Sequence, residues 1–121
     1  QNALAGKPLC LYNGGENRLD FTYVSDTAAG IMLAAKSKKA ANEIFNITRG
    51  EGRSIKEFAA VVARNVPGTR IEERESGDRV PSRGALDNSK ARRLLGFQPK
   101  HSIEQGIPKY IEGVREGKAV E

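Results

Sequence analysis

The chain has 121 residues, enough for one domain with a moderate hydrophobic core. Hydrophobic residues make up 38% and charged residues 29%, a balance typical of a globular protein and unfavourable to intrinsic disorder. The net charge of +5 suits anionic ligands, but no long basic run alternates with aromatic residues, so we expect no nucleic acid partner.

Membrane insertion and disulfide formation are also disfavoured. The longest apolar stretch, residues 28–35, is too short to span a bilayer, and no signal-like segment opens the chain. We therefore expect no membrane contact and a cytoplasmic location. Cys10 is the single cysteine and lies in an apolar run, which predicts a buried, inert thiol. Residues 3–8 read like the last turn of a helix, which predicts that the chain is a fragment of a longer protein.

The apolar pattern predicts short strands that alternate with about four helices. Strands are expected at residues 9–12, 21–24, 43–48 and 70–74, and helices at residues 25–36, 54–66, 89–95 and 102–114. Capping boxes begin the second and fourth helices, since Glu57 follows Ser54 and Gln105 follows Ser102 by three residues. In the first helix, Ser25 and Asp26 are expected to cap the free N–H groups.

The first helix and the third strand have unusual apolar patterns. Ala28, Ile31, Met32 and Ala35 form the expected apolar face of the helix, whose small neighbouring side chains allow another element to approach closely. The run at 43–48 is apolar on both faces, which is typical of a strand that is covered on both sides.

Few kinds of catalytic site are compatible with this sequence. His101 is the single histidine and stands beside a helix start, where a surface role is expected. No Cys/His spacing suits zinc, and no nucleophile elbow, phosphate-cradling glycine loop or dinucleotide fingerprint occurs. We expect no catalytic residue, metal ligand or cofactor-binding residue in this chain.

Arginines are the candidates for anion recognition. Arg18 lies at the entrance to the 21–24 strand, and Arg74, Arg79 and Arg83 bracket an irregular loop at residues 75–86. Guanidinium groups match pairs of phosphate oxygens, so these side chains could bind a diphosphate. Ion pairs with the acidic residues of the same region are the alternative.

Seven signatures, in order, resemble those of one family. They are residues 6–15 (GKPLCLYNGG), 20–26 (DFTYVSD), 44–47 (IFNI), 54–58 (SIKEF), 77–78 (GD), 87–99 (DNSKARRLLGFQP) and 102–107 (SIEQGI). Together they resemble the C-terminal part of the extended short-chain dehydrogenases/reductases. The resemblance is to the NAD-dependent epimerase/dehydratase group, which includes nucleotide-sugar enzymes such as UDP-glucose 4-epimerase.

The resemblance implies an α/β fold, with residues 1–121 forming one C-terminal substrate-binding domain of an extended Rossmann-fold enzyme. The glycine-rich NAD(P) loop and the Tyr-x-x-x-Lys pair of the family are absent, so the catalytic and cofactor half is missing. The parent would use NAD or NADP on a nucleotide sugar, and this chain alone would bind no cofactor and be inactive. The family also implies that the 25–36 helix and the 43–48 strand belong with the missing Rossmann half. Exposed apolar surface and possible homo-oligomers are therefore expected.

The family's substrate contacts correspond to Phe21, Asn46 and Asp78. Its two diphosphate-binding arginines would stand at Leu19 and Glu75, where this chain instead has Arg18 and Arg74 one residue earlier. A one-residue shift in a strand turns a side chain to the opposite face. The parent could therefore act as a reductase or dehydrogenase on a non-nucleotide substrate, such as a sterol-like or small carbonyl compound. A free-standing, non-catalytic interaction module is a third hypothesis.

Overall fold

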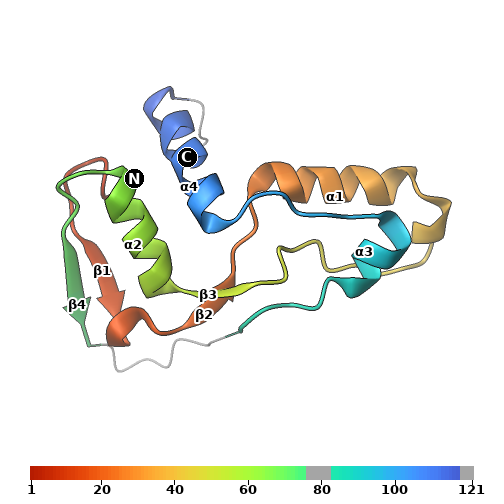
Figure 1. Cartoon of the computed structure of the whole chain (residues 1–121), viewed down its shortest axis with the longest axis horizontal. Coiled ribbons are helices and arrows are strands. Elements are labelled where there is room, and N and C mark those ends of the chain that lie inside the picture. The colour runs from red at the N-terminus through yellow and green to blue at the C-terminus, as the bar shows by residue number, and fades with distance from the viewer. Residues whose placement is uncertain (76–82, 118–121) are drawn as a thin grey trace.

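The structure is a computed structural model that describes residues 1–75 and 83–117. It is elongated, with one group of elements at each end (Figure 1). The strands are β1 (Leu9–Tyr12), β2 (Arg18–Asp20), β3 (Gly52–Ser54) and β4 (Ile71–Arg74). The α-helices are α1 (Val24–Lys36), α2 (Ile55–Asn65), α3 (Ser89–Leu95) and α4 (Ile103–Arg115). Short 3-10 turns occupy Asn13–Gly15 and Lys38–Ala40. Within the described residues, the expected α/β fold with short strands and four helices is confirmed.

One end of the molecule is built from β1, β4, α2 and α4. Strands β1 and β4 pair in parallel, with Leu9 opposite Ile71 and Tyr12 opposite Arg74. The apolar stripes of α2 and α4 meet beside this pair because each helix repeats apolar residues at helical spacing. We call the result the α2–α4 core; its buried members are Ala3, Val61, Val66, Ile103, Ile107 and Ile111.

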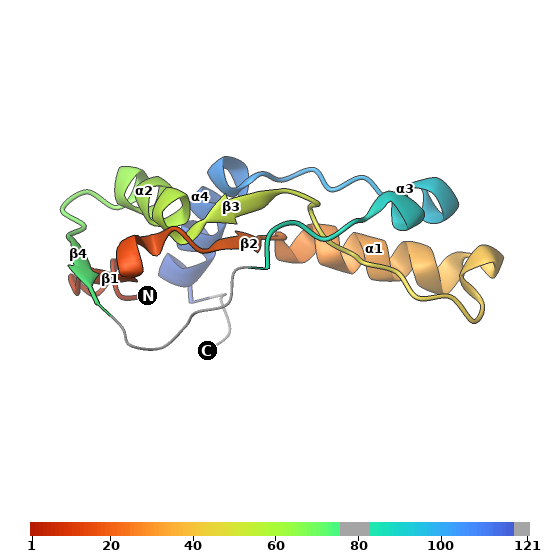
Figure 2. The ribbon, with the colours of Figure 1, turned by 90° about the horizontal axis from the view of Figure 1, so that it is seen from below.

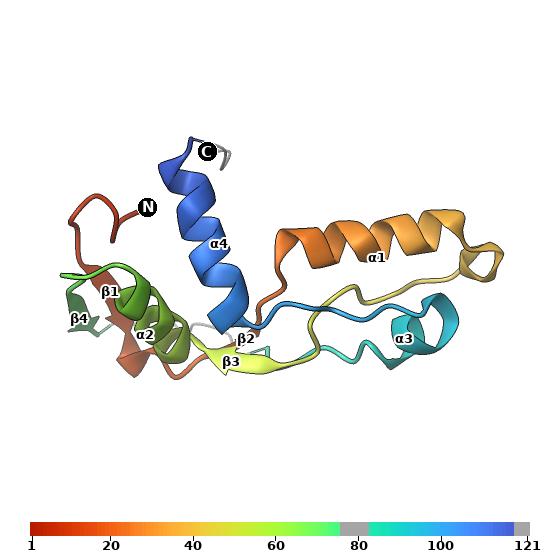
Figure 3. The ribbon, with the colours of Figure 1, turned by 45° about the horizontal axis from the view of Figure 1, so that its top comes forward.

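The other end joins α1 and α3 through a smaller α1–α3 core. Ala91, Leu95 and Phe97 are buried there, with Phe45 and Ile47 packed against them. Figure 3 shows α1, the chain after it and α3 lying together at this end. Gly30 of α1 allows the close approach, since a Cβ atom there would lie 2.2 Å from Cγ2 of Ile47. The expectation of a small-sided helix against another element is confirmed at this residue.

A two-stranded antiparallel ribbon of β2 and β3 connects the two ends (Figure 2). Arg18 is opposite Ser54 and Asp20 is opposite Gly52. Because β3 runs directly into α2 and β2 leads into α1, this ribbon fixes where both helices begin.

The helix boundaries confirm most of the capping predictions. Ser54 accepts a hydrogen bond from the Glu57 N–H at 3.1 Å, and the Glu57 carboxylate accepts from the Ser54 N–H at 2.7 Å. The Gln105 side chain accepts from the Ser102 N–H at 3.0 Å. Gly96 ends α3 with a φ of 67°, in the left-handed region that favours glycine.

The first helix begins at a different residue from the one predicted. It starts at Val24 with Tyr23 as its N-cap, so Ser25 and Asp26 are not the capping residues. Its apolar face is turned to solvent, with Ile31 59% and Met32 55% exposed, which agrees with the exposed apolar surface that the family resemblance implied for this helix. The described chain has nothing to cover this face, and the helix instead packs through Gly30 and Ala34.

Two predicted strands are also wrong. Residues 21–23 are irregular and only the preceding segment, β2, is paired. Residues 43–48 form no strand, because no other described segment pairs with them through backbone hydrogen bonds. Ile44 in this segment is 86% exposed. The half-buried Cys10 is also more accessible than predicted. No helix of the described residues is long and apolar enough to cross a membrane.

Candidate functional site

Arg18, the first predicted anion-binding residue, is engaged by other parts of the chain. Its guanidinium donates a hydrogen bond to the carbonyl of Gly52 and lies 3.9 Å from the Glu57 carboxylate. Its side chain is 54% exposed, so solvent weakens this ion pair. Arg18 therefore lies over the start of α2, beside the capping box.

Arg74, the second predicted arginine, lies at the end of β4. Its guanidinium is 3.3 Å from the carboxylate of Glu72, two residues earlier on the same face of the strand, and the hydrogen bond that Arg74 donates to Glu72 raises the pKa of Arg74. Arg74 also lines a polar cavity of about 570 Å³ with Asn13, Gly14, Glu73 and Glu75. The structure does not bring Arg18 into this cavity, so the two arginines do not form one clamp in it.

Phe21 and Asn46 lie in different surroundings. The Phe21 ring packs 4.6 Å from that of Phe58, centroid to centroid, at the edge of the α2–α4 core. Asn46 is exposed, and its Nδ2 donates to the carbonyl oxygen of Asp87 at 2.8 Å. Asp78, the remaining predicted substrate contact, lies outside the described residues.

Asp20 joins three segments just before α1. Its carboxylate accepts hydrogen bonds from the N–H of Gly50 at 3.0 Å and from the N–H of Leu86 at 3.2 Å. Charge-assisted bonds of this kind are stronger than neutral ones. Asp20 thus holds the end of β2 against the segments before β3 and before α3.

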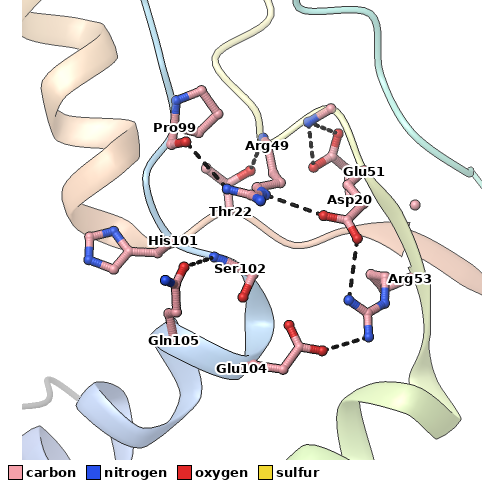
Figure 4. A network of polar contacts seen from close by, with 12 residues as sticks. Asp20, Thr22, Arg49, Glu51, Arg53, Pro99, His101, Ser102, Glu104 and Gln105 are labelled. Atoms are coloured by element: carbon pink, nitrogen blue, oxygen red, sulfur yellow. Dashed lines mark hydrogen bonds and ion pairs between the residues drawn. The ribbon is translucent and has the colours of Figure 1, made fainter.

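Two arginines and three glutamates form a polar network beside Asp20, and Figure 4 shows four of its members, Arg49, Arg53, Glu51 and Glu104. The Arg49 guanidinium donates to Glu51 and to the carbonyl of Pro99, both at 3.3 Å. The Arg53 guanidinium contacts three carboxylates, at 3.3 Å from Glu51, 3.2 Å from Glu57 and 2.7 Å from Glu104.

The network connects the starts of two helices. Arg53 is at the end of β3 and Glu104 is in the first turn of α4. The hydrogen bond from Arg53 lowers the pKa of Glu104 to about 2. Arg53 is only 20% exposed, so its three partners hold it in place rather than leave it available to a ligand.

A chain of three side chains crosses from α1 to α4. Asp26 is 4% exposed, and its carboxylate lies 2.9 Å from Nδ1 of His101, while Nε2 of His101 lies 2.9 Å from Nζ of Lys109. An ionised carboxylate only accepts, so Nδ1 carries a proton, and in the neutral ring Nε2 accepts from the lysine ammonium. The prediction of a surface role for His101 is wrong, since its side chain is 16% exposed.

Asp26 also accepts hydrogen bonds from two backbone groups, the N–H of Lys100 at 2.9 Å and the N–H of His101 at 2.8 Å. Burial raises the pKa of the Asp26 carboxyl, but the hydrogen bonds from His101 and Lys100 together outweigh it, so the pKa lies below its usual 3.8. Asp26 therefore stays ionised while it anchors the connection between α3 and α4.

An apolar pocket of about 590 Å³ opens between the start of α1, α2 and α4. Four of its lining residues are phenylalanine or tyrosine, and His101 and Lys109 also line it. Its residues are Phe21, Thr22, Tyr23, Val24, Phe58, His101, Ser102, Ile103, Gly106, Ile107, Lys109, Tyr110 and Gly113. No group of three or more potential metal ligands is found in the part of the chain that the structure describes.

The chain is similar to known proteins along nearly its whole length. The model of the NAD dependent epimerase/dehydratase family matches residues 1–48. UDP-glucuronic acid decarboxylase 2 of Arabidopsis thaliana is 31% identical over 115 residues, which are 94% of this chain and 25% of that protein. The chain is related to nucleotide-sugar epimerases, decarboxylases and dehydratases.

Solved structures of these enzymes share the fold. The dTDP-glucose 4,6-dehydratase of Bacillus anthracis, in complex with NAD, has a TM-score of 0.83 and 26% identity over 97% of this chain. The UDP-glucuronic acid 4-epimerase of Bacillus cereus, with UDP-glucuronic acid and NAD, has a TM-score of 0.79 and 28% identity over 93% of this chain. The chain spans 37% and 38% of those two solved chains.

Sequence reasoning missed the contacts of Arg53 and the Asp26–His101–Lys109 chain. His101 and Lys109 are eight residues apart across a helix start, and Asp26 is 75 residues from His101, so no local spacing indicates their contact. A sequence signal existed only for Arg53 and Glu57, four residues apart.

Proposed function

We propose that residues 1–121 are the C-terminal substrate-binding domain of a cytoplasmic, NAD(P)-dependent nucleotide-sugar epimerase, decarboxylase or dehydratase. In this proposal the cofactor-binding and catalytic half lies elsewhere in the parent enzyme, and the chain by itself is inactive. The parent oxidises a sugar transiently with NAD or NADP, and the present chain contributes contacts to its nucleotide portion.

The observation that carries this proposal is the coverage of the solved relatives. More than nine tenths of this chain aligns with a dehydratase and an epimerase whose structures hold NAD, and one of them also holds UDP-glucuronic acid. The remaining three fifths of those enzymes have no counterpart here. A domain of this size, without a dinucleotide fingerprint of its own, fits a substrate-binding role best.

Exposed apolar residues at one end of the molecule support the same proposal. Ile44 is 86% exposed, and Val24, Ile31 and Met32 of α1 are each more than half exposed. Large exposed apolar side chains on one helix and on the segment that follows it are candidates for an interface. We infer that α1 and the 43–48 segment pack on the Rossmann half, where the segment would gain a strand partner.

Reading the gene in frame upstream of Gln1 tests the proposal. It predicts a glycine-rich dinucleotide fingerprint after a strand pattern, followed by a Tyr-x-x-x-Lys pair. An open reading frame that continues upstream without either motif would contradict the proposal and favour the non-catalytic interaction module.

A second candidate is a related reductase or dehydrogenase with a non-nucleotide substrate. The observation that favours it is the pairing of Arg18 with Glu57 and of Arg74 with Glu72, which leaves both guanidinium groups partly satisfied by carboxylates. Leu19 and Glu75 stand at the positions where the family resemblance places the diphosphate ligands.

Turnover of sugar nucleotides by variants of the parent enzyme separates the two candidates. If Arg18→Ala and Arg74→Ala each abolish turnover while Arg115→Ala, at the end of α4, leaves it unchanged, the second candidate fails. Turnover of a carbonyl substrate without any turnover of UDP- or dTDP-sugars would establish it instead.

A further inference from the structure

The apolar pocket beside α4 has features of a small-molecule site. Its volume of about 590 Å³ lies within the range of ligand pockets, and most of its surface is apolar. Three elements contribute aromatic walls, with Tyr23 before α1, Phe58 on α2 and Tyr110 on α4. Tyr110 is 50% exposed, so a flat apolar ligand can reach its ring from solvent.

A single cationic group lies at the edge of these walls. Nζ of Lys109 is 2.9 Å from Nε2 of His101, and no carboxylate pairs with Lys109 among residues 1–75 and 83–117. Its contact with the ring holds it beside the pocket, because Asp26 fixes the ring through Nδ1 at 2.9 Å. The ammonium group thus keeps donor capacity for an anion at the mouth of the pocket.

We propose that this pocket binds a small amphipathic carboxylate, an aromatic acid whose ring lies among Tyr23, Phe58 and Tyr110 and whose carboxylate pairs with Lys109. The aromatic walls supply the apolar contacts, and the ammonium group selects an acid over a neutral compound of the same shape. The His101 ring positions the ammonium group without itself carrying the ligand's charge. Phe21, one of the expected substrate contacts, is among the lining residues, but neither expected diphosphate ligand, Arg18 or Arg74, lines the pocket, so an aromatic acid here is a ligand that the proposed function does not require.

The chain offers a clean way to close the pocket. Gly113 is on α4 and lines the pocket, and a Cβ atom added there would meet no heavy atom within 4 Å. Gly113→Phe therefore fills the cavity without a clash in the backbone, and Gly113→Leu is a smaller second variant. Lys109→Met removes the charge but keeps the apolar stem. Lys36→Met is the matched control for Lys109→Met, because Lys36 is at the end of α1 and does not line the pocket.

Titration of the full 121-residue chain with 1-naphthoate, followed by ¹H–¹⁵N correlation spectra, tests the proposal. We expect saturable shifts centred on Gly106 and Gly113, and binding about fivefold weaker in Lys109→Met and for 1-naphthalenemethanol. Gly113→Phe and Gly113→Leu are expected to abolish the shifts while keeping a dispersed spectrum, and Lys36→Met to behave as the parent chain.

Several results would overturn the proposal. One is the absence of saturable shifts at Gly106 and Gly113. A second is binding of 1-naphthalenemethanol as tight as that of 1-naphthoate, which would remove the role of Lys109. Shifts that persist in both Gly113 variants, or that centre on the exposed face of α1, would place the probe on another surface.

Discussion

Asp26 and His101 are 75 residues apart in the chain, yet the Asp26 carboxylate accepts hydrogen bonds from both the backbone N–H and the ring Nδ1 of His101. The two bonds attach the first turn of α1 to the connection that leads into α4. Because the carboxylate is 4% exposed, its loss would leave these donors without a partner in a buried place. Asp26 is therefore a structural anchor between the two ends of the molecule.

Asp26→Asn is expected to lower the free energy of unfolding by about 2 kcal/mol. The neutral amide oxygen accepts hydrogen bonds more weakly than a carboxylate. The amide N–H groups are donors, so they cannot accept the hydrogen bond that Nδ1 of His101 donates. Urea unfolding followed by circular dichroism measures this change. Ser25→Ala, at the exposed neighbouring position, is the control and should change stability by less than about 0.5 kcal/mol. Equal stability of the Asp26→Asn variant and the parent chain would contradict the anchoring role.

Asp26 and Glu104 both contribute to the pH dependence of stability, as do Glu57 and Asp87, whose pKa values are also lowered by hydrogen bonds. The carboxyls of Asp26 and Glu104 have a pKa in the folded chain below the usual 3.8 and 4.5, and hydrogen bonds from Arg53 hold that of Glu104 at about 2. A carboxyl with a lowered pKa stabilises the fold above its unfolded pKa, and this contribution is lost as the pH falls through the folded pKa. We expect stability to be constant from pH 7 to about pH 5 and to fall between pH 4.5 and 2.

Glu104→Gln tests whether the Glu104 carboxyl contributes to the loss of stability between pH 4.5 and 2. The variant should be less stable than the parent chain at pH 7, and its stability should fall less steeply between pH 4.5 and 2, since one of the carboxyls with a lowered pKa is gone. Urea midpoints at half-unit pH steps provide the comparison. Identical pH profiles for both chains would exclude Glu104 as a contributor.

Two glycines in helices predict opposite effects of alanine. At Gly30 an added Cβ would lie 2.2 Å from Ile47 and 3.1 Å from Phe97, so Gly30→Ala should destabilise the chain by about 1–3 kcal/mol through overpacking. At Gly113 an added Cβ has open space, so Gly113→Ala should stabilise the chain by up to about 1 kcal/mol. Thermal unfolding of the two variants should therefore shift in opposite directions, and a shift in the same direction would refute the packing described at Gly30.

Much of this fold could be predicted from sequence where the signal is local. The Ser54–Glu57 box, Gly96 after α3 and the short apolar run of β1 each depend on a few neighbouring residues. The start of α1 was mispredicted because the Asp26 side chain bonds to the backbone at residues 100–101 instead of capping its own helix. These hydrogen bonds join segments that are far apart in the sequence, so the spacing of neighbouring residues does not indicate them.

The segment at 43–48 illustrates a different limit. Its apolar residues have strong strand propensity, but a strand requires a hydrogen-bonding partner, and the described residues offer none. The same limit applies to the two arginines that were predicted to bind a diphosphate. Sequence placed Arg18 and Arg74 near turns and strand ends, whereas their pairing with Glu57 and Glu72 depends on the three-dimensional arrangement.

The exposed apolar end predicts association of the isolated chain. Ile44 is 86% exposed and Ile31 is 59% exposed, so we expect dimers or larger species at high concentration. Ile44→Glu should weaken this association by about tenfold or more, because burial of one isoleucine contributes roughly 1.5–3 kcal/mol. Light scattering over a concentration series measures it, and a monodisperse monomer at high concentration would contradict the prediction.

The central claim is that this chain is the substrate-binding part of a nucleotide-sugar enzyme. Isothermal titration calorimetry tests it most directly. UDP-glucuronic acid and dTDP-glucose are titrated, in the presence of NAD, into the gene product that carries this chain. The proposed function predicts saturable binding of at least one of these sugar nucleotides, weakened when Arg74→Met removes the guanidinium from the polar cavity and unchanged in the exposed control Arg115→Met. Absence of binding by UDP- and dTDP-sugars in a product that binds NAD would contradict it.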